Sequence, residues 1–329
     1  MAGLWHERKE FFEKNSCTLS RLATRAKLQP ELLVIIDKNF NYVKDSDEEL
    51  QKQIFRLNLA FWLAKPYLLK ETVDELLQRP ILPKQLIADS LFLMIELGAA
   101  PLATTTIEEI RSLLSEAEQN RLTTAFSPLE MIIKIATSSI ADGIAWLLNH
   151  KTKKLNKEEE RVLFFLLRKA INEQKLDLCS DLLQEIKEKK LQVQHIEYFD
   201  ALLVEVYLFK HDYASAEEIL NKHSHARISD ETSPLYFPYG CFLAHSKGKK
   251  MAIAHFSKLL ETPYPRSWLT GAHYLTGNIH LEPGGWVERS FLWERRRLYE
   301  QLALFYFVTN DKEKATSFHK LAAKEYVHE

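Results

Sequence analysis

The chain is almost without glycine and proline over its middle third. Between Leu129 and Ser233 the sequence has no proline and a single glycine, Gly143. The whole chain of 329 residues has only nine glycines, well below the usual share of ~7%. Tight hairpins, phosphate-binding loops and dinucleotide-binding folds all need glycine at defined positions. The sequence therefore predicts an all-α fold without a β-sheet, in which polar turns join the helices.

The composition limits the class of protein further. Apolar residues make up 46% of the chain and charged residues 27%, which is typical of globular domains. The formal net charge is −1, so the balance of charge does not predict nucleic-acid binding. The three cysteines lie far apart, which favours reduced thiols and a cytoplasmic location. No stretch approaches the about eighteen apolar residues that a membrane span requires, so we expect none.

One pattern of aromatic and small residues recurs along the C-terminal half. Its copies begin near Glu160, Glu197, Ser233 and Arg296, which are 37, 36 and 63 residues apart. Small residues allow two helices to cross closely, while aromatic residues fill the gap to the next pair. The spacing therefore predicts successive pairs of antiparallel helices, with extra residues before the last pair. The last copy is carried by Tyr299, Leu302, Ala303, Tyr306, Ala315 and Ala322.

This spacing resembles that of tetratricopeptide-repeat proteins over about residues 160–329. The resemblance implies a TPR-like α-solenoid, a right-handed superhelical stack of antiparallel helix pairs, which acts as a scaffold for a protein or peptide. We therefore divide the chain into an N-terminal helical section without the repeat signature, 1–155, and a section of helical hairpins, 156–329. An inserted helix and loop are predicted at about 266–286. The polar, basic run 151–157 marks the boundary.

In this family the first helix of each pair lines the inner face. Family members that hold a peptide carboxylate do so with inward lysine and asparagine side chains, and this sequence has neither at the matching places. The absence of these lysine and asparagine side chains favours a partner with an apolar or amphipathic segment. The predicted inner face contains Tyr198, Ala201, Glu205, Phe209, Phe237, Cys241, His245, Arg297, Glu300 and Leu304.

Aromatic and arginine residues are dense between residues 233 and 307. Such residues often dominate the energy of protein–protein binding. The alternative is that these aromatic side chains fill the irregular joint around the insertion and belong to the core. The predicted partner-binding residues are Phe237, His245, Trp268, Trp293 and Arg297.

Motifs for catalysis and for cofactor binding are absent from the sequence. It contains no G-x-S-x-G, no H-E-x-x-H, no Walker loop and no G-x-G-x-x-G. The glycine pair Gly284-Gly285 lacks the nearby lysine and hydroxyl of a phosphate-binding loop. Beyond Asp230 and Glu231, no carboxylate or cysteine accompanies the pair His223 and His225 in a metal-binding pattern. We therefore expect no enzyme activity of the chain by itself, no cofactor and no metal.

An alternative function is RNA binding, because helical-repeat proteins can follow an RNA strand. The balanced net charge weighs against it. Phosphate contacts would make such binding fall steeply with salt. The basic residues that could line one edge are Lys151, Lys153, Lys154, Lys157, Lys187, Lys189, Lys190, Lys247, Lys249, Lys250 and Arg295 to Arg297.

A second resemblance concerns two segments near the insertion. Residues 261–268 read Glu-Thr-Pro-Tyr-Pro-Arg-Ser-Trp, and residues 291–301 read Phe-Leu-Trp-Glu-Arg-Arg-Arg-Leu-Tyr-Glu-Gln. Both are similar to the helical C-terminal region of chlamydial serine/threonine protein kinases. The chain has none of the H-R-D, D-F-G and Val-Ala-Ile-Lys signatures of a kinase domain. The resemblance therefore implies the non-catalytic recruitment region of a larger bacterial kinase.

Overall fold

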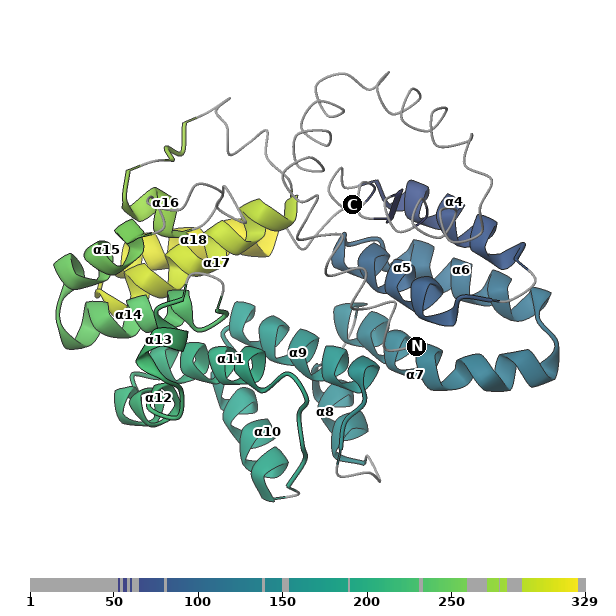
Figure 1. Cartoon of the computed structure of the whole chain (residues 1–329), viewed down its shortest axis with the longest axis horizontal. Coiled ribbons are helices and arrows are strands. Elements are labelled where there is room, and N and C mark those ends of the chain that lie inside the picture. Colours follow the sequence, from purple (N-terminus) through teal and green to yellow (C-terminus); the bar gives the residue numbers. More distant parts are fainter. Residues whose placement is uncertain are drawn as a thin grey trace. The chain divides into compact units, whose positions relative to one another are not determined.

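The computed structural model describes residues 53, 56, 57, 60, 65–79, 82–137, 140–149, 154–188, 190–230, 233–258, 271–277, 279–282 and 292–324. These residues form fifteen α-helices and no β-sheet (Figure 1), with one isolated bridge between Lys154 and Gln192. The prediction of an all-α chain is confirmed over this part. The helices are α4 (Pro66–Leu77), α5 (Lys84–Glu96), α6 (Ala100–Leu113), α7 (Glu116–Thr137), α8 (Ile140–Leu148), α9 (Lys157–Asn172), α10 (Leu176–Glu188), α11 (Ile196–Phe209), α12 (Tyr213–Leu220), α13 (His225–Ile228), α14 (Tyr236–Ser246), α15 (Lys249–Ser257), α16 (Gly271–Leu275), α17 (Leu292–Val308) and α18 (Lys312–Lys324).

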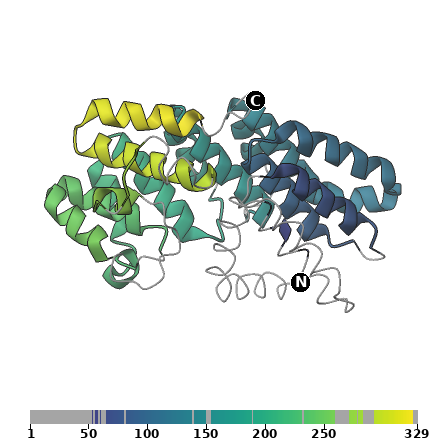
Figure 2. The ribbon, with the colours of Figure 1, turned by 90° about the horizontal axis from the view of Figure 1, so that it is seen from above.

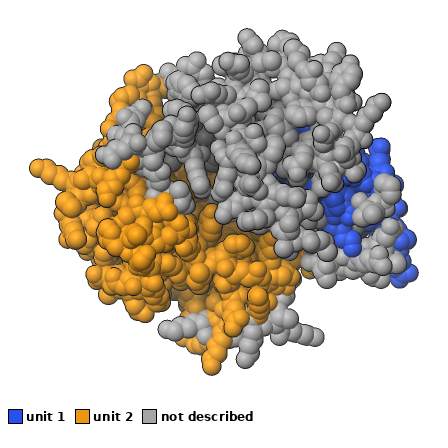
Figure 3. Space-filling view, in the orientation of Figure 1, with its two compact units in different colours: residues 1–126 blue, residues 127–329 orange. Residues whose placement is uncertain are grey.

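The chain forms two compact units, residues 1–126 and residues 127–329 (Figure 3). The limit between these units falls within α7. The division predicted at residue 155 concerns where the repeat signature begins, and it stays a prediction. The residues proposed to bind a partner all belong to the second unit.

In the first unit, α4, α5 and α6 pack against one another. Gly98 ends α5 with a φ of 80°, a conformation that glycine adopts at little cost after a helix. Lys70 of α4 reaches Glu109 of α6, with 2.8 Å between Nζ and Oε2. The unit therefore has an apolar helical core, and the ion pair between Lys70 and Glu109 joins α4 to α6 at its surface. Its most buried apolar residues include Leu69, Val73, Leu76, Ile87, Leu91, Met94, Ala103, Ile107 and Ile110.

In the second unit, four pairs of helices follow one another along the chain: α9 and α10, α11 and α12, α14 and α15, and α17 and α18. The two helices of each pair contact each other and are joined by two or three residues. Each joint contains one residue with a positive φ, namely Gln174, His211, Gly248 and Asn310. The first three of these are spaced by 37 residues (174, 211, 248). This spacing is close to that of the pattern in the sequence.

Three of these turns use the same two backbone hydrogen bonds. In the first, Gln174 donates its N–H to the carbonyl three residues earlier at 3.0 Å, and Lys175 donates to the carbonyl five residues earlier at 2.8 Å. His211 donates its backbone N–H to the carbonyl three residues earlier at 3.2 Å, and Asp212 donates to the carbonyl five residues earlier at 2.9 Å. Asn310 and Asp311 form the same two bonds, at 3.1 and 2.9 Å. The bonds satisfy carbonyls that the end of a helix leaves without partners. Each aspartate side chain then accepts a backbone N–H in the first turn of the next helix, so one short turn ends one helix and begins another.

The two helices of a pair approach closely at small residues. Ala303 and Ala315, predicted at a crossing, are 0% and 3% exposed. At Gly240 of α14 the approach is closer still, because an added Cβ would lie 2.2 Å from the ring of Phe256 on α15. Phe256 is completely buried and its ring stacks on Phe237 with 4.9 Å between centroids. The ring therefore has little room to move away.

The fourth pair contacts more of the unit than the pair before it. α17 packs against α11 as well as α14, and α18 packs against α9 (Figure 2). In a linear stack, each pair contacts only the pairs next to it. These extra contacts bring α9, α11 and α17 together. As a consequence, part of the face expected to line an open groove is covered by the chain itself.

Replacing Gly240 by alanine tests the approach of α14 to α15. The new methyl group has no room beside the Phe256 ring, so we expect the free energy of unfolding to fall by about 1–3 kcal/mol. Urea unfolding followed by circular dichroism measures the loss. The double variant Gly240→Ala, Phe256→Leu should lose less than the sum of the two single variants, because leucine leaves space for the methyl group. Strict additivity would contradict a direct contact.

Candidate binding surface

Phe237, the first predicted binding residue, lies in the core. Its side chain is only 6% exposed. Gly271 at the start of α16 covers it, since a Cβ there would lie 2.9 Å from the Phe237 ring. The backbone N–H of Gly271 also donates to Oε1 of Gln301 on α17 at 2.8 Å. Phe237 thus supports the surface through packing, and α16, within the predicted insertion, joins it to α17.

His245 is exposed near the end of α14, at the beginning of a row of rings. Its imidazole stacks on Tyr213 of α12, with 3.3 Å between centroids and 5° between planes. The Tyr213 hydroxyl lies 2.9 Å from Nδ1 of His211, and the His211 ring stacks on Phe307 of α17 at 4.7 Å. The row joins three helix pairs near their turns. His245 is eight residues after Phe237, or about 12 Å along the helix, so the two residues lie at opposite ends of α14.

Arg297 is exposed on α17. Its guanidinium is nevertheless partly desolvated: burial and the positive charge of Arg168 lower the pKa of Arg297, while Glu205, Tyr198 and Glu300 act in the opposite direction. Tyr198 lies in the first turn of α11 and is 59% exposed. An exposed tyrosine near an exposed arginine has the composition of a binding hot spot. The two belong to the predicted inner face, at a place that the fourth pair leaves open.

The two predicted tryptophans lie outside the part of the chain whose side chains the structure describes. Trp268 falls in the undescribed residues 259–270, and Trp293 falls in the first turn of α17. Trp293 precedes Arg297 by four residues, about one helical turn. Of the predicted set, Phe237 is thus buried, His245 and Arg297 are exposed, and the side chains of the two tryptophans are not described; the set as a partner site stays a proposal.

Charged side chains meet where α9, α11 and α17 come together. Nη1 of Arg168 lies 2.9 Å from Oε2 of Glu205 and 3.5 Å from Oε2 of Glu300. Nδ2 of Asn172 donates to Oε1 of Glu300 at 2.9 Å. The side chains of Glu205 and Glu300 are only 16% and 11% exposed. We call this cluster, Arg168, Asn172, Glu205 and Glu300, the polar joint.

The electrostatics of the polar joint favour a structural role. Burial raises the pKa of Glu205, and the negative charge of Glu300 acts in the same direction, while the positive charge of Arg168 opposes both. A carboxylate in such a place needs its cation to remain ionised. Both carboxylates of the polar joint are engaged by donors from α9. The arrangement therefore holds three helices together, and it offers no free acid or base for catalysis.

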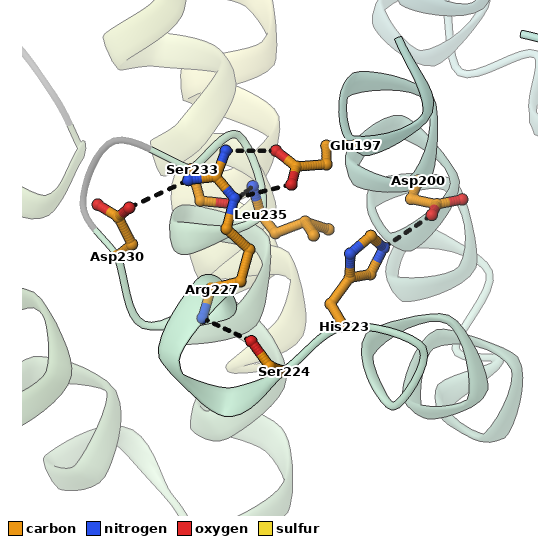
Figure 4. A network of polar contacts seen from close by, with 8 residues as sticks. All are labelled: Glu197, Asp200, His223, Ser224, Arg227, Asp230, Ser233 and Leu235. Atoms are coloured by element: carbon orange, nitrogen blue, oxygen red, sulfur yellow. Dashed lines mark hydrogen bonds and ion pairs between the residues drawn. The ribbon is translucent and has the colours of Figure 1, made fainter. Parts of the chain in front are cut away.

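A second polar network anchors the connection between α12 and α14 to α11 (Figure 4). Arg227 of α13 donates from Nε to Glu197 at 2.7 Å and from Nη1 to Asp230 at 3.0 Å. The hydrogen bond with Arg227 lowers the pKa of Glu197. Nε2 of His223 lies 2.8 Å from Oδ2 of Asp200. Because Glu197 and Asp200 both belong to α11, the network fixes this connection against one helix.

The described residues contain no group of three histidine, cysteine or acidic side chains placed to hold a metal ion. His223 is bonded to Asp200, while His225 lies edge-on to Tyr239 with 6.1 Å between ring centroids. The two histidines are therefore engaged separately. In the same part of the chain, no helix has the length and apolar character needed to cross a bilayer.

The predicted inner face is partly core. Phe209, Cys241 and Leu304 are 4%, 0% and 2% exposed, because α11, α14 and α17 pack on one another. Sequence reasoning missed Arg168, which holds two of the predicted residues, since nothing in the spacing indicates that α9 and α17 meet. The predicted inner-face residues that the structure brings together are Glu205, Arg297 and Glu300.

Replacing Arg168 by methionine tests the polar joint. The variant removes the larger of the two positive charges, Arg168 and Arg297, that favour ionised Glu205, so the pKa of this residue should rise further above its value in the unfolded chain. A carboxyl group with a raised pKa in the folded state costs stability as the pH rises through that value. We therefore expect a loss of about 2 kcal/mol in the free energy of unfolding at pH 8, and a smaller loss at pH 5.

The matched control is Lys175→Met, which removes a more exposed ion pair with Glu173 and should cost less than about 1 kcal/mol. Urea unfolding at both pH values gives all four losses. Equal losses of unfolding free energy for the two variants, or a loss from Arg168→Met that does not depend on pH, would contradict the stabilising role of Arg168 in the polar joint.

Cys179 and Cys241 are 1% and 0% exposed. Burial raises the pKa of the Cys179 thiol to about 12 and that of Cys241 well above its ordinary value. Because the thiolate is the reactive form, a Cys17→Ser variant should show no fast reaction with a disulfide reagent when folded. Two thiols should react after denaturation. A fast thiol in the folded variant would show that α10 or α14 opens readily.

Comparison with known proteins gives one relative. The chain is 26% identical over 274 residues to the serine/threonine-protein kinase PknD of Protochlamydia amoebophila. The match covers 83% of this chain and 27% of the kinase. The chain thus spans about a quarter of the length of that relative, and the match supports the predicted resemblance to chlamydial kinases. No family model matches the chain, and no solved structure matches it.

Proposed function

We propose that this chain is a non-catalytic recruitment region related to a segment of a larger bacterial serine/threonine kinase, and that it binds a protein or peptide. The observation that carries the proposal is the match of 83% of the chain to only 27% of a kinase. A kinase domain needs a glycine-rich loop and a lysine on a β-strand, whereas the described residues are helical and contain no sheet. The matched segment of the kinase therefore corresponds to a part outside its catalytic domain.

We also propose that the four helix pairs are tetratricopeptide-like hairpins in a right-handed stack. The regular spacing of the turn residues Gln174, His211 and Gly248 and the buried small residues at the crossings support this relationship. The contacts of α17 and α18 with α9 and α11 add a feature that the linear stack lacks. In this proposal the fourth pair folds back on the first two.

The partner-binding region proposed for this stack is the exposed part of its inner face. It contains Tyr198 and Arg297, which are close enough to interact electrostatically, together with Trp293 one turn before Arg297. His245 extends the region toward the turns, and Trp268, which lies outside the described residues, stays part of the proposal from the sequence. The partner proposed from the sequence, an apolar or amphipathic segment, would use the aromatic groups, while Arg297 would bind a carboxylate or carbonyl at its edge.

Selection from a displayed library of amphipathic peptides tests this function. We expect selected peptides to bind the full chain, and Arg297→Ala or Trp293→Ala to lose about 2 kcal/mol of binding free energy. The control Lys324→Ala, at the end of α18, should bind normally. Circular dichroism of both variants must show unchanged helix content. A loss of helix in Trp293→Ala would mean that this tryptophan stabilises the core and does not contact the partner.

Two outcomes would contradict the proposal. Transfer of phosphate from ATP to a protein substrate by the purified chain would make it catalytic. Failure of every peptide, with tight binding of single-stranded RNA that weakens steeply with salt, would favour the RNA-binding alternative.

A further inference from the structure

The α14–α15 pair carries positive charge without acidic residues. Residues 233–260 contain no aspartate and no glutamate, although the whole chain has 45 acidic residues among 329. The same stretch contains Lys247, Lys249, Lys250 and Lys258. A chain with a net charge of −1 thus concentrates positive charge on one helix pair.

Three of these lysines project from the turn between α14 and α15. Every residue from His245 to Met251 is exposed, and Met251 keeps 49% of its surface accessible. Within the described part of the chain, Lys247, Lys249 and Lys250 form no ion pair. Their charges are therefore not neutralised by carboxylates of the described residues, in contrast to the charge of Arg168 in the polar joint.

The neighbouring pair contributes a fourth lysine and a ring. Nζ of Lys249 lies 6.0 Å from the centroid of the Tyr306 ring, and Nζ of Lys314 lies 5.0 Å from the same centroid. The α14–α15 and α17–α18 turns are thus neighbours, as Figure 2 also shows. Lys314 is partly neutralised by Asp311 at 3.5 Å. We call the group Lys247, Lys249, Lys250 and Lys314 around Tyr306 the lysine surface.

We propose that the lysine surface docks an acidic segment of a partner protein. The proposal rests on the recruitment function above and specifies the charge of the partner. Clustered ammonium groups speed the encounter with carboxylates and orient the bound segment. A nucleic-acid strand fits less well, because three of the four lysines belong to one turn instead of following a track. The nearby rings of Tyr213, His211 and Phe307 also pack against one another, whereas a single-stranded site offers free ring faces to bases.

Fluorescence anisotropy of the full chain with two labelled peptides tests the proposal. The probe is an octapeptide of glutamate, and its matched control is an octapeptide of glutamine. We expect the glutamate probe to bind at low salt, and its affinity to fall as salt screens the charges. The variant Lys247→Glu, Lys249→Glu, Lys250→Glu should weaken binding by roughly tenfold or more.

A second variant separates local charge from net charge. Lys222→Glu, Lys320→Glu, Lys324→Glu changes the net charge equally, at exposed residues near the opposite ends of α12 and α18, and should retain the affinity. An unchanged urea midpoint shows that both variants fold.

Four results would overturn the proposal: no binding of the glutamate probe, equal binding of the glutamine probe, equal losses in both variants, or tighter binding of single-stranded RNA to the same lysines. Failure here leaves the recruitment function standing if the selected amphipathic peptides still bind through Arg297. Conversely, phosphate transfer by the chain would contradict the proposed recruitment function, whether or not the glutamate octapeptide binds.

Discussion

One guanidinium group connects three helices of the second unit. Arg168 of α9 lies between Glu205 of α11 and Glu300 of α17, and removing the cation from beside two largely buried carboxylates is costly. The contact therefore fixes how far α17 can slide or turn against the first two pairs. Apolar packing of α17 on α11 and α14 is non-directional by comparison, so the polar joint supplies the register and the packing supplies most of the free energy.

The position of α17 decides which surfaces remain for a partner. A linear stack would leave the first helices of all pairs along one open face. Here α17 covers the middle of that face, and Phe209, Cys241 and Leu304 become core residues. What stays accessible lies at the two ends of the first helices: Tyr198 and Arg297 at one end, and His245 with the lysine surface at the other. Binding of one long segment along a continuous inner groove is therefore not the arrangement that these contacts favour.

Local features of this fold could be predicted from the sequence because they depend on neighbours in the chain. The near absence of glycine indicates helices, and the small residues at regular intervals indicate where pairs cross, as the buried Ala303 and Ala315 show. The polar joint could not be predicted, since the pairing of Arg168 with Glu300 depends on how the fourth pair returns to the first. The role of Phe237 was open for the same reason. An aromatic side chain at this spacing suits a groove or a core, and only the position of Gly271 decides between them.

The contrast between two groups of cations indicates where function is to be sought. Arg168 and Arg227 are held by carboxylates of the chain, so their charge is already compensated and would have to be released before a partner used it. Lys247, Lys249 and Lys250 are exposed on a turn whose backbone geometry comes from Gly248, with a φ of 90°, and not from any bond to their side chains. Among the described residues, the fold uses these three charges in no ion pair, and only Lys249 lies near aromatic rings, whereas clustered like charges repel one another. Binding an acidic partner would relieve that repulsion, so these lysines, which form no ion pair within the described part of the chain, are suited to recognition.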